Sequence, residues 1–202
     1  MSDKPENVDL DKKKDDENDE GGGSLLTRML DSRTIIASKS VDDRMARDVI
    51  GQLFILEQDD AERPITVIIN SPGGSADSGF AIYDAIRFVS CPVRTITMGM
   101  CASAAVMIFL AAEKGRRFAT PSSRFLLHQP SMSTIGQASD LEIISAEIER
   151  IKNQYNTVVA EATGKSIDVI DEHVSRDFWL SSQAAVDYGL VDRIVTRRNE
   201  IE

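Results

Sequence analysis

Hydrophobic positions along the first hundred residues switch repeatedly between the spacing of a helix and that of a strand. Over residues 40–57 apolar side chains recur every three or four positions after a cluster of acids, which predicts an amphipathic helix. The β-branched run at 65–69 is bounded by turn residues and predicts a buried strand. A second helical pattern at 80–89 and a second strand at 93–98 follow. This alternation predicts an α/β domain in which helices pack against a parallel sheet.

The remainder of the pattern continues in the same style with shorter elements. Residues 99–112 are small or apolar on every side, which predicts a buried helix. Further strands are predicted at 116–119, 124–128 and 191–195, and further helices at 166–174 and from Ser181 or Ser182 to a stop at Gly189. Pro130 blocks extension of the strand at 124–128 into a paired central position, because proline lacks the N–H that a ladder requires.

The longest helical pattern covers residues 137–163 and ends before Gly164, at the expected cap position. Its apolar stripe alternates steps of three and four: Leu141, Ile144, Ile148, Ile151, Tyr155, Val158 and Ala162. The stripe has two interpretations. It forms a seam against another copy of the chain, or the helix lies across its own domain.

Charge is concentrated at the N-terminus. The 202-residue chain carries a formal charge of −10, and residues 1–23 hold nine Asp or Glu against four Lys, a net −5. This segment has too few apolar residues to offset the entropy lost on ordering it. We therefore predict an acidic disordered tail at 1–23 and one folded domain at 24–202. The lack of a basic patch argues against nucleic-acid and anionic-membrane partners.

Targeting and cofactor signals are weak. No apolar run reaches the length of a membrane span and the N-terminus does not resemble a secretory signal, so a cytoplasmic location is expected. Cys91 and Cys101 lack metal-type spacing and are expected to be free thiols. With only His128 and His173 in the chain, a histidine-based metal cluster is not expected either.

Three features have the chemistry of a serine hydrolase, although each has a simpler interpretation. Ser103 falls where a strand gives way to a helix, a position also typical of an ordinary helix cap. His128 emerges at the end of an apolar strand, where a structural histidine is equally common. Gly73 and Gly74 can expose backbone N–H groups to an oxyanion, or merely form a tight turn. Asp177 cannot be singled out by spacing.

Seven short blocks together resemble a known family in order and spacing. They are Asn-Ser-Pro-Gly-Gly-Ser at 70–75, Gly-Met-Cys-Ala-Ser-Ala at 99–104, Arg-Phe-Ala-Thr-Pro at 117–121, Leu-His-Gln-Pro at 127–130, Gly-Gln-Ala-Ser-Asp at 136–140, Arg-Asp-Phe-Trp-Leu-Ser at 176–181 and Tyr-Gly-Leu-Val-Asp at 188–192. The resemblance is to the peptidase subunit of the Clp protease, and it covers about residues 24–196.

The resemblance implies a crotonase-like α/β fold with a long helix that protrudes between rings. It implies Ser103 as nucleophile, His128 as general base and Asp177 as the acid that orients the base, with the backbone N–H groups of Gly74 and Ala104 as oxyanion hole. It further implies two stacked seven-membered rings, fed with unfolded polypeptides by a hexameric ATP-driven unfoldase. The subunit itself would need no cofactor and no metal.

Departures from the family pattern leave alternatives open. Cys101 and the pair Ala104-Ala105 replace Ala and Met-Gly, residues 131–135 replace a glycine-rich stretch, and no apolar stretch precedes Ser24. The first rival is a crotonase-type acyl-CoA enzyme, and the second is a structural or regulatory subunit of a mixed Clp ring. Cys101 is a rival thiol nucleophile. His173 is expected to be a solvated residue of a short helix.

Overall fold

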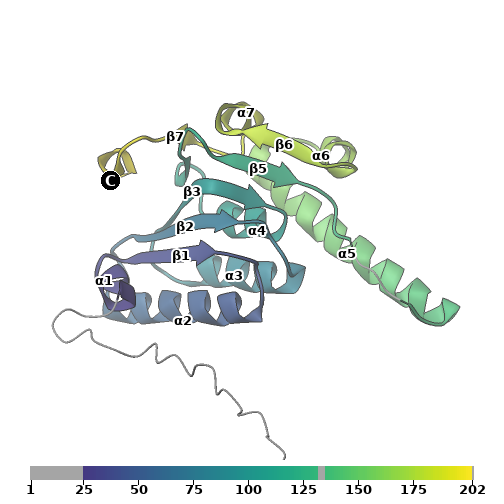
Figure 1. The fold of residues 1–202 in the computed structure, drawn as a ribbon, viewed down its shortest axis with the longest axis horizontal. Helices are drawn as coiled ribbons and strands as arrows, with labels where there is room; N and C mark the ends of the chain where they lie inside the picture. Colours follow the sequence, from purple (N-terminus) through teal and green to yellow (C-terminus); the bar gives the residue numbers. More distant parts are fainter. Residues whose placement is uncertain (1–24, 132–134, 202) are drawn as a thin grey trace, which may run out of the picture.

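The computed structural model describes residues 25–131 and 135–201 (Figure 1). The predicted tail at 1–23 and three residues of the 131–135 segment lie outside the described residues. The elements, in order, are α1 (Leu25–Asp31), β1 (Thr34–Ser38), α2 (Asp43–Asp59), β2 (Ile65–Ser71), α3 (Ala76–Phe88), β3 (Val93–Ala102), α4 (Ala104–Leu110), β4 (Arg117–Ala119), β5 (Arg124–Leu127), α5 (Ala138–Thr163), α6 (Ile167–Val174), β6 (Phe178–Ser181), α7 (Ser182–Tyr188), β7 (Arg193–Ile194) and a 3-10 turn (Arg198–Ile201).

A predominantly parallel sheet confirms the α/β prediction. Strands β1, β2, β3, β4 and β7 form one parallel path, in that order. Besides β2, strand β3 pairs with two further strands: Thr95–Thr97 with β4, and Met100–Ala102 with β5. The last strand, β6, runs antiparallel to β5. The long β3 therefore joins the main sheet to the β5–β6 pair, and the candidate chemistry lies near this junction.

The core forms where the helices cover the sheet. Helices α2, α3 and α4 contact one another in sequence, and α4 also contacts β2, β3 and β5. All seven residues of α4 are buried, which confirms the prediction of a helix that is apolar on every side. A smaller cluster of Ile96, Phe118, Val195 and Ile201 packs separately from this main core. The N-terminus of α4 is thus fixed between the sheet and its neighbouring helices.

Helix α5 packs across its own domain along only part of its length. Its C-terminal part is buried at Tyr155 and Val158 and contacts α4 and α6, whereas the N-terminal part extends away from the body (Figure 1). Ile143, in that extended part, is 70% exposed. Gly164 ends the helix in the left-handed region with φ 72°, as predicted. None of the described helices is both long enough and apolar enough to cross a bilayer.

The structure corrects several boundaries. The helix predicted at 99–112 begins only at Ala104, because residues 99–102 continue β3 and pair with β5. Elements α1 and β1 were not predicted, since β1 is short and has a polar residue at each end. Strand β6 was not identified as a strand, and the strand predicted at 191–195 shortens to Arg193–Ile194.

Candidate active site

Ser103 occupies a strained turn between β3 and α4. Its φ of 55° and ψ of −124° lie where residues other than glycine are rare. The backbone N–H of Ser103 donates to the carbonyl of Leu126 at 2.9 Å, which ties the turn to β5. The side chain makes no capping hydrogen bond, so Ser103 does not act as an ordinary N-cap. Its hydroxyl is therefore not used in capping helix α4.

The pairing of β5 with β6 sets His128 against Asp177. Leu127 lies opposite Phe178 in this antiparallel register, so the next pair outward is His128 and Asp177. Nδ1 of His128 lies 3.5 Å from Oδ1 of Asp177, somewhat longer than a normal hydrogen bond. The imidazole is 30% exposed and the carboxylate 65% exposed. The backbone N–H of Gln129 donates to the Val174 carbonyl at 3.0 Å, which holds the chain after β5 against the end of α6.

Gly73 and Gly74 form a turn that tolerates no side chain. Their φ angles are 87° and 152°. A Cβ on Gly73 would lie 2.6 Å from the Cβ of Ser103, and one on Gly74 would lie 2.3 Å from the carbonyl oxygen of Val41. The Gly73 carbonyl accepts from the Val41 N–H at 2.9 Å, and Val41 in turn accepts from the Ser75 N–H. These two hydrogen bonds hold the turn against Val41, and the missing side chain at Gly73 lets the turn approach Ser103 closely.

Two backbone N–H groups beside this turn are available as donors. Within the described part of the chain, the N–H of Gly74 and that of Ala104 donate to no acceptor. The Cβ position built on Gly73 lies 3.1 Å from the Ala104 nitrogen, so the glycine turn and the first residue of α4 approach each other closely. Such a pair of amides can stabilise a negatively charged oxygen that develops next to Ser103.

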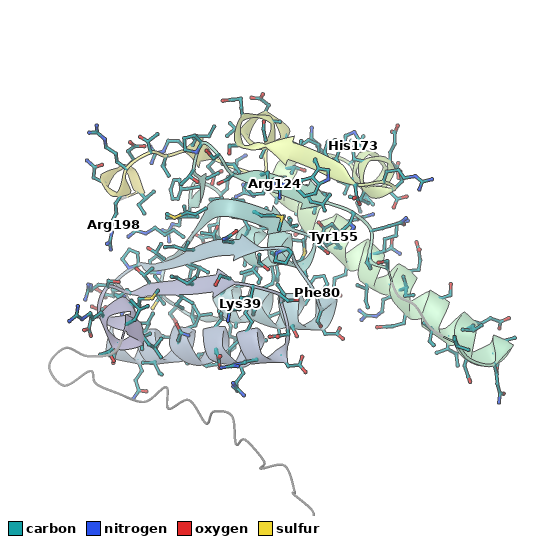
Figure 2. The ribbon with its side chains drawn as sticks, in the orientation of Figure 1. Lys39, Phe80, Arg124, Tyr155, His173 and Arg198 are labelled. Carbon is teal, nitrogen blue, oxygen red and sulfur yellow. The ribbon has the colours of Figure 1, made fainter. Side chains whose placement is uncertain are left out.

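A cavity of about 470 Å³ unites most of these groups. Gly74, Ser103, Ala104 and His128 all line it, while Asp177 lies behind His128 and is not part of the wall. The rest of the wall is mainly apolar and includes Phe80, Met107, Ile148, Ile151 and Tyr155. Figure 2 shows Phe80 and Tyr155 on the side of the body from which α5 extends. The apolar stripe of α5 predicted either a seam with another copy or packing across the domain, and neither interpretation identified these residues as cavity lining.

The two cysteines and Ala105 do not line the cavity. Cys101 is fully buried in β3, and burial raises the pKa of its thiol well above the ordinary value, which disfavours it as a nucleophile. Cys91 is also a free, buried thiol, as expected. Ala104 lines the cavity, whereas its neighbour Ala105 is fully buried and does not.

The prediction that His173 is simply solvated is wrong. Its ring stacks on Phe178 with 4.8 Å between centroids, and its Nδ1 lies 2.8 Å from the hydroxyl of Tyr188. Phe178 directly follows Asp177 in the chain. The sequence could not reveal this aromatic cluster, because the three residues come from α6, β6 and α7, which meet only in the fold.

Comparisons with known proteins agree with this architecture. The family model described as Clp protease matches residues 17–198. The ATP-dependent Clp protease proteolytic subunit 1 of Protochlamydia amoebophila is 43% identical over 86% of this chain and 85% of its own, and subunit 2 of Treponema denticola is 40% identical over 94% of each. The structure of a ClpP1 point mutant from Listeria monocytogenes superposes with a TM-score of 0.82 at 38% identity, covering 89% of this chain and all of that one. The family model spans most of the chain and the relatives share its length, so the chain belongs to the Clp protease family.

Proposed function

We propose that this chain is a serine endopeptidase that cleaves unfolded polypeptides, with Ser103 as nucleophile, His128 as general base and Asp177 as the group that orients the base. The observation that carries the proposal is the convergence of three chain segments. Ser103 and His128 line the same cavity, and Asp177 lies on the far side of the imidazole at 3.5 Å. Family membership supports the same assignment, since the relatives are named proteolytic subunits.

Each group has a defined step in this chemistry. The Ser103 hydroxyl attacks the peptide carbonyl while His128 accepts its proton. Asp177 holds the imidazole in the productive tautomer and stabilises the cation that forms. The N–H groups of Gly74 and Ala104 donate to the oxyanion of the tetrahedral intermediate. His128 then delivers the proton to the leaving amine, and water releases the acyl group by the same route in reverse.

Assembly into stacked seven-membered rings belongs to the same proposal. The N-terminal part of α5 exposes Leu141 and Ile143 away from the body, and these side chains require a covering surface such as a second copy of the chain. A hexameric ATP-driven unfoldase would deliver substrates to the enclosed sites. A cytoplasmic location suits such a machine, because enclosure protects folded neighbours from a peptidase with little sequence specificity.

A second candidate is a regulatory or structural subunit of a mixed ring. Two observations favour it: the Asp177 carboxylate is exposed, and it lies at a long distance from His128. Contact with a neighbouring subunit could shorten that distance. The crotonase-type acyl-CoA enzyme is disfavoured, because the chain belongs to the Clp protease family.

Labelling with a fluorophosphonate separates these functions. We expect the purified full-length chain to be captured covalently at Ser103 and to hydrolyse a fluorogenic peptide. Ser103→Ala should lose both properties and keep the same particle size by light scattering. Turnover that survives in Ser103→Ala removes the nucleophile assignment. Capture that appears only after a paralogous subunit is added favours the mixed ring.

A further inference from the structure

Among the described residues, one carboxylate borders the cavity that the proposed base also lines. Asp77 lies in the first turn of α3, three residues after Gly74, and its exposed carboxylate contributes to the cavity lining. Phe80 follows one helical turn later and forms part of the apolar wall. Asp77 therefore lies at the mouth of an apolar pocket that begins at the candidate nucleophile.

Nothing else on the described wall neutralises this carboxylate. Apart from Asp77 and His128, the lining residues are uncharged. No hydrogen bond or ion pair reaches the Asp77 carboxylate within residues 25–131 and 135–201. Asp77 is thus the one carboxylate among the described residues that line the cavity.

Arg150 on α5 feels the charge of Asp77 but is already paired with Glu147. The carboxylate of Glu147 accepts three hydrogen bonds from the Arg150 guanidinium, the shortest at 2.7 Å, and this pair is the largest cause of the raised pKa of Arg150. Asp77 adds a smaller contribution to that raised pKa. Its field therefore reaches toward α5, the helix that supplies the opposite wall through Ile148 and Ile151.

We propose that Asp77 is a specificity-determining residue that favours a lysine or arginine at the substrate position whose carbonyl is attacked. The aliphatic stem of such a side chain packs against Phe80 and Met107, while its cationic head reaches the carboxylate at the mouth. Long basic side chains commonly bury their stems and keep their charged ends near water. The inference rests on the proposed peptidase function, because it places the scissile carbonyl beside Ser103.

The test compares two peptides that differ only in charge. Fluorogenic substrates carry lysine or norleucine before the scissile bond, so that the stems match, and kcat/KM is measured for each with the full-length chain. In Asp77→Asn the lysine-to-norleucine ratio should fall roughly threefold to fivefold, the range expected of a partly exposed ion pair. High salt should reduce the ratio in the parent chain and leave it unchanged in the variant.

Asp84→Asn is the matched control, since Asp84 is an exposed acid on the same helix that does not line the cavity. Its ratio should equal that of the parent chain. An unchanged ratio in Asp77→Asn, with normal norleucine cleavage, overturns the inference and leaves the peptidase proposal intact. An equal fall in Asp84→Asn also overturns it, because the effect would then be nonspecific. A parent chain that cleaves neither peptide and resists fluorophosphonate overturns the proposed function together with the inference.

Discussion

Replacing Ser103 by glycine should abolish activity and stabilise the fold at the same time. Ser103 adopts φ 55° and ψ −124°, a conformation available to glycine but strained for a residue with a Cβ. Strain of this kind costs about 1–3 kcal/mol. Glycine removes it, at an expense of about 0.5–1 kcal/mol for the more flexible unfolded chain. Because the serine side chain makes no capping bond, little else is lost, and a net gain of about 1 kcal/mol is expected.

Ser103→Ala is the matched control, because alanine also lacks the hydroxyl and yet keeps the Cβ that causes the strain. Free energies of unfolding are compared by urea denaturation, with Tm as a second readout, in which about 1 kcal/mol corresponds to roughly 2–4 °C for a chain of this size. Both variants should be inactive, and only the glycine variant should exceed the parent in stability. Equal stability of the two variants would show that the turn stores no strain, and the reasoning would fail.

Two further substitutions test neighbouring parts of the structure. Gly73→Ala would bring a Cβ within 2.6 Å of the Ser103 side chain and 2.5 Å of a backbone oxygen, so we expect about 2 kcal/mol or more of destabilisation and at least about a 10²-fold loss of kcat/KM; peptide hydrolysis within twofold of the parent would contradict this. Asp171→Asn removes a 2.7 Å ion pair with Lys152, which lowers the pKa of the Asp171 carboxyl. Since the folded pKa lies below the unfolded value near 3.8, the pair stabilises the fold above that pH and its contribution is lost as pH falls through the folded pKa. The variant should lose up to about 0.5 kcal/mol at pH 7 and show a shallower decline in stability between about pH 5 and 3, and acid limbs that run parallel would argue against it.

Periodicity predicted the elements that bury one continuous face. The stripe ahead of Gly164 located α5, and the β-branched run at 65–69 located β2, because in both cases local spacing reflects burial directly. It failed at residues 99–102, where small side chains fit a strand and a buried helix equally well. Only the pairing of β3 with β5 decides that case, and this pairing joins residues more than twenty positions apart.

The residues of the candidate site likewise differ in whether local sequence could reveal them. Gly73 and Gly74 were recognisable as a special turn, since the residue type itself indicates unusual backbone angles. Asp177 was not recognisable from spacing, because acids are common in this chain and its relation to His128 exists only through strand pairing. The resemblance to the family supplied what local patterns could not. The strain at Ser103 was also invisible in the sequence, because serine is an ordinary residue at a helix start.

The alignment of the proposed base and acid is, in physical terms, a consequence of core packing between the same two strands. Phe125 lies opposite Leu180, and both are buried, while His128 and Asp177 fall on the alternate face. A slip of one residue in β6 would exchange these faces and drive the acid toward the apolar side. Burying an unpaired carboxylate there costs several kcal/mol, far more than the weak attraction of an exposed imidazole and carboxylate could offset. The hydrophobic pair therefore fixes the register, and the register places the catalytic candidates.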